Sequence, residues 1–418
     1  MNPTAPAEAP AAPGRTRTPD SAHHHRSRTT WDEAHATART CAPAPLPAVA
    51  HTLADALGCA LARPLAALTD LPSFDTSAMD GWAVAGPGPW RLHGAGVLAG
   101  AHPAPLEPRT AVPIATGAPV PAGATAVLRR EHGLADAGTL HLTAPRPLAP
   151  RGDIRPRGQE CAAGEALLPA GTPVTPAVLG LAAAAGYDRL PVHRRPTVDV
   201  LLLGDELLHS GLPRAGRVRD ALGPMLPPWL ERTGARVRGV QPIPDELDAL
   251  QRALAATDAD VVVTTGSTAA GPVDFLHTAL ARAGARLLVD SVAVRPGHPM
   301  LLAHLPPAPD GRARRLVGLP GNPLAAVAGV ATLAAPLLTR LAGHREAPLR
   351  TTPAAVALPG HPHDTRLLPV HLTPEGATPA AFDGPAMLRG LTLADALAVV
   401  PPGGAAQEAR VRLLGVPR

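Results

Sequence analysis

The chain has no lysine, only two asparagines, three cysteines and few aromatic residues. All 38 basic residues are arginines, yet the formal net charge is only +4. No arginine cluster is interleaved with aromatic side chains, so nucleic-acid binding has little support, while an arginine pocket for a small anion stays open. The cysteines form no Cys-x-x-Cys pair, which argues against a disulfide framework and a cysteine-ligated zinc site.

The sequence also has no long apolar run and no secretory signal. No apolar run approaches the length of a membrane span, and the N-terminus lacks a hydrophobic signal core. Residues 1 to 28 are rich in proline, alanine and threonine and predict a disordered leader. Its triplet His23-His24-His25 either binds a metal or, as we favour, is incidental. These features predict a soluble cytoplasmic protein without nucleic-acid or membrane partners.

Proline and glycine are abundant, with 53 and 40 of the 418 residues. The length predicts roughly three or four domains. Residues 30 to 65 place apolar residues at helical spacing, and residues 71 to 150 hold short apolar runs between prolines and glycines, a pattern typical of a β-rich domain. Residues 350 to 418 have a strand pattern typical of the last part of a β-barrel.

Strand-like and helix-like segments alternate between residues 195 and 345, which predicts a doubly wound α/β domain with a parallel sheet. In such sheets, ligands bind at the carboxyl ends of the strands. The predicted strands include 198–203, 236–242, 260–265 and 287–294, and the predicted helices are 222–233, 245–256, 273–283 and 324–341.

The predicted fold is therefore multidomain, α/β and β. We expect a discontinuous linker domain, a β-rich domain, the α/β domain and a C-terminal β-barrel-like domain. Their predicted limits are 29–65 with 161–194, then 66–160, 195–346 and 347–418.

The turn Pro320-Gly321-Asn322-Pro323 is the most informative motif in the chain. It joins an apolar strand to an apolar helix, and its glycine lets the backbone approach a ligand. The helix that follows offers unpaired N–H groups to an anion. Apart from Asn2, Asn322 is the only asparagine. The alternative is a turn that only caps the helix.

A second strand, 261–265, leads into the small-residue loop Gly266-Ser267-Thr268-Ala269-Ala270-Gly271 before a helix. This loop is a possible anion cradle, although small residues are common throughout the chain. Asp274 follows in the first turn of the helix. It either interacts with the helix dipole or holds a cation or water near a phosphate.

Carboxylates follow a third strand, where Asp205 and Glu206 are adjacent and Asp220 is a further candidate. Mg²⁺ usually takes one or two carboxylates together with phosphate oxygens, so these acids could bind it; the alternative is that they are exposed loop acids. Arg295 precedes Pro296-Gly297-His298-Pro299, which puts a guanidinium suited to an oxyanion at the same edge of the sheet.

Two loops of the β-rich segment concentrate polar residues, and each is either a binding site or an ordinary turn. The first, Ser77 to Val84, contains Asp80 next to a glycine and a tryptophan, and the second begins Thr116-Gly117.

In this order, the motifs resemble the molybdopterin molybdenumtransferase family (the molybdenum insertases MoeA and the E domain of gephyrin). The resemblance covers about residues 30 to 418. The segments that carry it are SAMDGWAV at 77–84, TGAPVPAGA at 116–124, IRPRGQE at 154–160, GDEL at 204–207, VRPGHP at 294–299, LPGNP at 319–323 and MLRGLTLADALAVVPPG at 387–403.

The resemblance implies a homodimer of four-domain subunits whose α/β domain binds adenylylated molybdopterin. The adenylyl group is then hydrolysed, molybdate is inserted and AMP is released, with Mg²⁺ at the site. The enzyme that adenylylates the pterin is a further possible partner. The resemblance places Asp274, Glu206 and Asp205 near the phosphates and metal, and Asp80 across the dimer cleft.

The sequence departs from the family pattern at several positions. Ser267 replaces a glycine, Ala269 and Ala325 replace serines, Arg295 and His298 replace lysines, and Thr125 replaces an acid. The alternative to an active insertase is therefore a catalytically degenerate molybdopterin-binding or scaffold paralogue.

Overall fold

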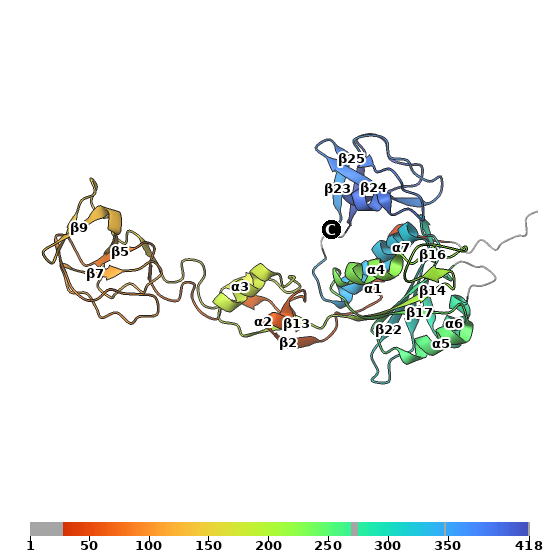
Figure 1. The fold of residues 1–418 in the computed structure, drawn as a ribbon, viewed down its shortest axis with the longest axis horizontal. Helices are drawn as coiled ribbons and strands as arrows, with labels where there is room; N and C mark the ends of the chain where they lie inside the picture. Colours follow the sequence, from red (N-terminus) through yellow and green to blue (C-terminus); the bar gives the residue numbers. More distant parts are fainter. Residues whose placement is uncertain (1–27, 269–274, 347, 417–418) are drawn as a thin grey trace, which may run out of the picture.

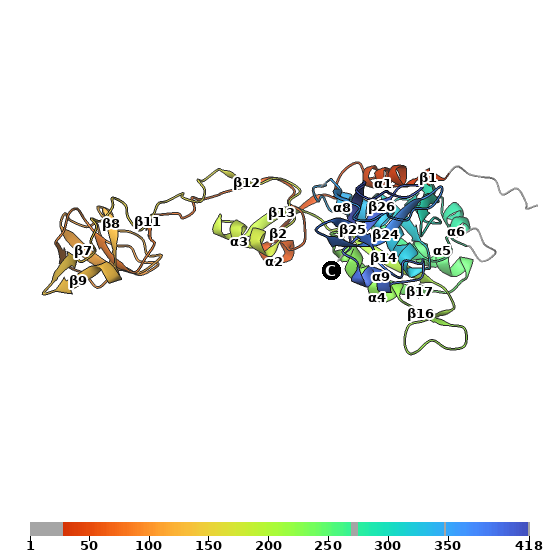
Figure 2. The same ribbon diagram turned by 90° about the horizontal axis from the view of Figure 1, so that it is seen from above.

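The computed structural model describes residues 28–268, 275–346 and 348–416, and the chain is elongated. A β-rich body lies at one end, a small linker body lies in the middle, and the α/β and C-terminal bodies lie together at the other end (Figures 1 and 2). The predicted leader, apart from residue 28, lies outside the described residues. The predicted domain limits stay a prediction.

The α/β body is built on a sheet in the order β17-β14-β18-β22-β21-β19. Helices α5 and α6 pack on one face, and α1, α4, α7 (Pro323–Gly329) and α8 (Ala335–Leu341) pack on the other, because alternate side chains of the strands enter separate apolar clusters (Figure 1). The bounds are β14 Thr197–Leu203, β17 Arg236–Ile243, β18 Val261–Thr265, β19 Arg286–Asp290, β21 Leu301–Leu305, β22 Arg314–Leu319, α1 Trp31–Thr40, α4 Leu222–Glu231, α5 Leu247–Ala256 and α6 Leu276–Arg282.

The prediction of an all-parallel sheet is wrong at one strand of this sheet. Strands β17, β14, β18 and β22 are parallel, but β21 runs antiparallel to both of its neighbours. The predicted strand 287–294 is also two strands, β19 and β20 (Val292–Arg295). They are separated at Ser291, whose φ of 72° turns the chain so that β20 joins the C-terminal sheet.

A buried helix from Pro323 to Leu341 fills the centre of the α/β body. It consists of α7 (Pro323–Gly329), the π-helical segment η2 (Val330–Ala334) and α8 (Ala335–Leu341). By length and composition it could cross a membrane, so our prediction of no apolar run of that length is wrong. However, 78% of its most apolar window is buried in the described structure, as expected of a core helix. Trp31 Nε1 donates to Thr332 Oγ1 at 3.0 Å, which ties α1 to this helix.

The predicted helical segment 30–65 is helical mainly in α1, which begins with a capping box between Thr30 and Glu33. Residues 48–52 form the strand β2 instead, because antiparallel pairing with β13 prevails over the local helical spacing. The elements of the linker body are β2 Ala48–Thr52, α2 Leu53–Ala56, β3 Leu65–Ala66, β12 Ala166–Leu168, α3 Pro176–Ala184 and β13 Arg189–His193.

The β-rich body holds a sheet in the order β8-β5-β7-β6-β10-β9. Gly81 opens β5 beside β8, where an added Cβ would lie 1.9 Å from the carbonyl oxygen of Leu128, so the position requires glycine. The bounds are β4 Thr76–Ser77, β5 Gly81–Val84, β6 Trp90–Leu92, β7 Thr110–Ile114, β8 Ala126–Arg129, η1 Arg130–His132, β9 Gly133–Asp136, β10 Thr139–Leu142 and β11 Ile154–Arg155.

The C-terminal body is barrel-like, as predicted. Its strands follow the order β25-β24-β26-β27-β23, and Ala355 N donates to Ala377 O at 2.9 Å, which brings the chain after β23 back to β25. Strand β20 joins β24, and β1 in turn pairs with β20, so this body is continuous with the α/β body. The bounds are β1 Thr29–Thr30, β23 Arg350–Pro353, β24 Thr365–Thr373, β25 Gly376–Pro379, α9 Arg389–Leu393, β26 Ala396–Val400 and β27 Arg410–Gly415. A separate two-stranded ribbon, β15 (Leu207–Leu208) with β16 (Val218–Arg219), follows β14 in the chain.

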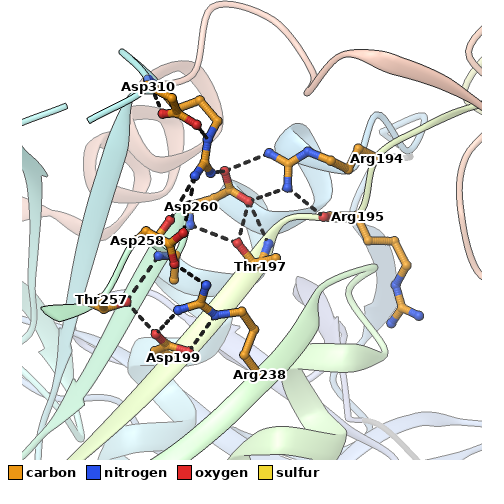
Figure 3. A network of polar contacts seen from close by, with 11 residues as sticks. Arg194, Arg195, Thr197, Asp199, Arg238, Thr257, Asp258, Asp260 and Asp310 are labelled. Carbon is orange, nitrogen blue, oxygen red and sulfur yellow. Dashed lines mark hydrogen bonds and ion pairs between the residues drawn. The ribbon is translucent and has the colours of Figure 1, made fainter. Parts of the chain in front are cut away.

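A polar network holds the amino edge of the α/β sheet where the linker body joins it (Figure 3). Asp260 is 1% exposed, and its carboxylate accepts from both terminal nitrogens of Arg194 at 2.8 Å, from Thr197 N and Oγ1 at 2.8 Å and from Arg312 at 3.0 Å. Burial raises the pKa of Asp260, but the bonds from Arg194 and Thr197 outweigh burial and lower it. Because Arg194 directly follows β13 of the linker body, this network fixes the linker body to the α/β sheet.

Candidate functional site

Three glycine-containing turns converge at the carboxyl edge of the α/β sheet, as the sequence predicts for such an edge. Gly266 N donates to Leu319 O at 2.9 Å, and a Cβ on Gly321 would lie 3.7 Å from Gly266 Cα. Gly297, at a φ of 99°, lies so close to α7 that a Cβ would be 2.7 Å from Ala325 O. The loops 266–268, 296–299 and 320–323 therefore form one continuous surface.

A cavity of about 610 Å³ opens beside these turns, between the α/β body and the C-terminal barrel. Six predicted residues line it: Arg295, Pro296, Gly297, His298, Pro320 and Asn322. Asn322 is the residue before α7, but its side chain makes no capping hydrogen bond, so the simple alternative of a helix cap does not account for it.

The C-terminal barrel supplies residues that the sequence analysis missed. Arg366 on β24 and Asp383 line the cavity, together with His361 and the turn Gly384-Pro385. In a chain whose basic residues are all arginine, a single arginine carries little information. One sequence signal could have indicated this side of the cavity. Arg366 lies close to His361 and His363, which is a local concentration of basic residues at the start of a strand.

The cationic groups of the cavity are paired with carboxylates of the barrel. Arg295 Nε donates to Asp364 at 2.8 Å, and Arg366 Nη2 donates to Asp383 at 2.6 Å. The Asp364 side chain is only 5% exposed, whereas those of Arg366 and Asp383 are 26% and 32% exposed. In the first pair the carboxylate is therefore part of the packed wall while Arg295, 39% exposed, lines the cavity, and in the second pair both partners line the cavity.

His298 lies beside Arg295, with 3.4 Å between its Nδ1 and Arg295 Nη1. Burial and the nearby Arg295 and Arg28 lower the pKa of His298, and Asp364 only partly offsets them. The imidazole is therefore neutral at pH 7 before any anion binds.

The loop after β18 has a backbone suited to close approach. Gly266 has a φ of 83° and Ser267 a φ of 49°, so the serine adopts a left-handed conformation that favours glycine. Neither residue lines the cavity, and nor do Gly321 and Pro323. The predicted residues Gly271 and Asp274 lie outside the described residues.

The predicted metal ligands are not all brought together in the part of the chain that the structure describes, where no group of three His, Cys, Asp or Glu could hold a metal. Asp220 is buried and caps α4 by accepting from Leu222 N and Gly223 N, both at 2.9 Å. Asp205 and Glu206 are exposed at the carboxyl edge, where Asp205 N donates to Asp245 at 3.2 Å. Asp274, which would complete the metal site, lies outside the described residues, so the metal site stays a prediction.

The two predicted loops of the β-rich body pack against each other. The Asp80 carboxylate accepts from Thr116 N at 2.7 Å and from Thr116 Oγ1 at 3.0 Å, and these bonds lower its pKa. Gly117 N donates to Ser77 O at 2.8 Å. Within one chain, however, β5 lies at the opposite end of the molecule from α7 (Figures 1 and 2), so Asp80 cannot reach the cavity of its own chain.

Three regions of the chain match known families. Residues 29–186 match the MoeA N-terminal region (domains I and II), 199–340 a probable molybdopterin binding domain, and 351–409 the MoeA C-terminal region (domain IV). The fold resembles a molybdopterin biosynthesis MoeA protein from Pyrococcus horikoshii, with a TM-score of 0.71 at 22% identity over 93% of this chain and 99% of that one.

Curated relatives are more similar in sequence. A molybdopterin molybdenumtransferase from Synechococcus elongatus is 33% identical over 69% of this chain and 74% of its own length. Molybdopterin molybdenumtransferase 2 from Mycobacterium tuberculosis is 36% identical over 69% of this chain and 73% of its own. These relatives support a role in molybdenum cofactor biosynthesis, and with this identity and coverage the chain belongs to the molybdopterin molybdenumtransferase family, a family of transferases.

Proposed function

We propose that the protein is a cytoplasmic molybdenum insertase, which hydrolyses adenylylated molybdopterin, inserts molybdate and releases AMP. The cavity at the carboxyl edge of the α/β sheet carries this proposal. It places Arg295, His298 and Arg366 around one space next to three glycine-containing turns. Guanidinium groups and helix N-termini suit a tetrahedral oxyanion and phosphate groups.

In this proposal, the turns bind the pterin substrate and the basic residues bind molybdate. Backbone N–H groups approach the phosphates closely because the turns have little side-chain bulk. The substrate-binding residues of this edge are Gly266, Ser267, Gly271, Arg295, Pro296, Gly297, His298, Pro320, Gly321, Asn322 and Pro323.

The carboxylates would serve the hydrolytic step. Asp205, Glu206, Asp220 and Asp274 offer the oxygen ligands that Mg²⁺ takes, although Asp220 already caps a helix. When bound, Mg²⁺ would neutralise charge on the phosphate oxygens. Asp274 and Glu206 would orient the water that adds to the adenylyl phosphorus, as the bond from that phosphorus to the pterin phosphate breaks and AMP leaves.

The position of Asp80 supports a homodimer. Asp80 is exposed directly before β5, with Thr116 and Gly117 beside it, and β5 belongs to the β-rich body at the opposite end of the molecule from α7 (Figure 1). The loop therefore needs a facing surface that its own chain does not offer. We propose that it faces the carboxyl edge of the partner chain. Light scattering at micromolar concentration should give twice the chain mass, and an active monomer would contradict this arrangement. The enzyme that adenylylates the pterin is proposed as a transient partner.

A second candidate is a catalytically degenerate molybdopterin-binding or scaffold paralogue. The observation that favours it is the pairing of the cavity's guanidinium groups with internal carboxylates, together with Ser267 at a glycine-type position. Such a protein would keep the pterin site and lose metal insertion.

One experiment separates these two functions. The purified full-length protein is incubated with adenylylated molybdopterin, Mg²⁺ and molybdate, and AMP release and molybdenum incorporation are measured separately. An insertase gives both products. Retained pterin binding without either product would support the scaffold, and loss of pterin binding would exclude both.

A further inference from the structure

A short segment of the C-terminal barrel crosses the cavity beside the start of α7. We call residues Asp383, Gly384 and Pro385 the strap, and all three line the cavity. The chain approaches the strap through Phe382, which has a φ of 62° and lies 4.4 Å below the guanidinium of Arg389. An added Cβ at Gly390 would lie 2.2 Å from Ala381 O, so only glycine allows this close packing. The strap is thus held in position by its own body.

The strap occupies hydrogen-bond donors that an oxyanion would use. Pro385 O accepts from Leu324 N at 2.9 Å and from Ala325 N at 3.2 Å, which are N–H groups in the first turn of α7. Asp383 Oδ2 accepts from Arg366 Nη2 at 2.6 Å. Helix N-termini and guanidinium groups are two kinds of anion donor, and the strap places one of its oxygens on each.

The two carboxylates near the cavity differ in how easily they can be displaced. Asp364 does not line the cavity, is 5% exposed and accepts from Arg295, so it belongs to the packed wall. Asp383 and Arg366 both line the cavity, and their side chains are 32% and 26% exposed. Ion pairs with this access to solvent are weak, so an incoming dianion can take over the guanidinium.

We propose that Asp383 is an affinity-determining residue of the site, because its carboxylate competes with the oxyanion for Arg366. This inference rests on the oxyanion site of the proposed function. A dianion binds when Asp383 releases Arg366, so the affinity is lower than the arginine alone would allow. No covalent bond is made or broken; the hydrogen bond from Arg366 to Asp383 is exchanged for hydrogen bonds from Arg366 to the incoming anion.

Equilibrium dialysis of the full-length protein against molybdate tests the competition without using catalysis. Asp383→Asn keeps the shape of the strap and removes its charge. We expect this variant to bind molybdate about three- to tenfold more tightly than the wild type. Asp383→Ser, with a smaller side chain, should show the same direction of change. Glu375→Gln is the matched control, since Glu375 is an exposed carboxylate of the same body that does not line the cavity.

A double-mutant cycle identifies the group for which Asp383 competes. Arg366→Gln should weaken binding, and Asp383→Asn should bring no gain in that background. The inference is overturned if both Asp383 variants bind molybdate like the wild type, if no variant binds it, or if the gain persists with Arg366→Gln. Failure of the proposed function would give a different result. The protein would release no AMP and incorporate no molybdenum, although Asp383→Asn would still bind molybdate more tightly than the wild type in the dialysis.

Discussion

At the amino edge of the α/β sheet, Asp260 is 1% exposed and accepts hydrogen bonds from Arg194, Thr197 and Arg312 (Figure 3). At the carboxyl edge of the same sheet, Arg366 and Asp383 pair in a cavity with side chains 26% and 32% exposed. The arginines of the two edges are similarly exposed, at 31% for Arg194 and 26% for Arg366, but the carboxylate is buried in the first pair and partly exposed in the second. The comparison indicates that burial, and not the presence of ion pairs, separates charges that stabilise the fold from charges available to a ligand.

The largest expected effect belongs to the carboxyl edge and to catalysis. Asp274→Asn keeps the side-chain volume and removes the charge that would orient metal or water. We expect AMP release to fall by about 10²- to 10⁴-fold, with pterin binding within a few-fold of the wild type. Quenched single-turnover assays measure both quantities. Wild-type AMP release by this variant would mean that Asp274 only interacts with the helix dipole.

The second prediction concerns the amino edge and stability. Asp260→Ala leaves Arg194 and Arg312 without their buried partner, so the free energy of unfolding should fall by about 3 kcal/mol or more. Chemical denaturation followed by circular dichroism measures the change. The control is Asp310→Ala, which removes a carboxylate that is 55% exposed beside the same Arg312 and should lower the free energy of unfolding much less. Equal losses in the two variants would contradict the role given to burial.

The third prediction uses pH to examine His298. Its pKa is lowered in the free protein by burial and by Arg295 and Arg28, while a bound dianion favours the protonated imidazole. Binding therefore takes up a proton, and molybdate affinity should fall by up to about tenfold from pH 6 to 8. His298→Lys should flatten this dependence because lysine stays charged throughout.

Molybdate dialysis at three pH values compares the two proteins. Identical pH profiles for the wild type and His298→Lys would show that the imidazole does not contact the anion.

The smallest expected effect is at Ser267. Its φ of 49° disfavours a side chain, so Ser267→Gly should raise the free energy of unfolding by up to about 1 kcal/mol. The greater conformational entropy of glycine in the unfolded chain reduces this gain. Ser210→Gly is the matched control: Ser210 is exposed and not among the residues with positive φ, so glycine there should destabilise slightly. Destabilisation by Ser267→Gly would mean that its side chain contributes contacts that outweigh the strain.

Local sequence patterns predicted much of the α/β domain. Buried strands such as Val261–Thr265 are continuous runs of β-branched residues, and the glycine and proline turns that follow the strands identify the edge at which the cavity lies. The patterns failed where pairing is long-range. Residues 48–52 have helical spacing but pair with residues 189–193, and β20 leaves its expected sheet at Ser291 to join the barrel.

The barrel side of the cavity could not be predicted from local patterns. Arg366 and Asp383 lie far from residues 295–323 in sequence and meet them only through the packing of two bodies. Asp220 is a different case, because its carboxylate accepts from the N–H groups of Leu222 and Gly223, only two and three residues further on. This local cap of α4 was interpreted from the sequence as a possible metal ligand.

The contrast between the two edges is tested most directly by measuring molybdate affinity and unfolding free energy on two arginine variants. Arg366→Gln should weaken molybdate binding while the unfolding free energy changes by about 1 kcal/mol or less. Arg194→Gln should lower the unfolding free energy by about 3 kcal/mol, because it leaves Asp260 buried with fewer donors, and should leave the affinity unchanged. A loss of affinity in Arg194→Gln as large as that in Arg366→Gln would contradict the account.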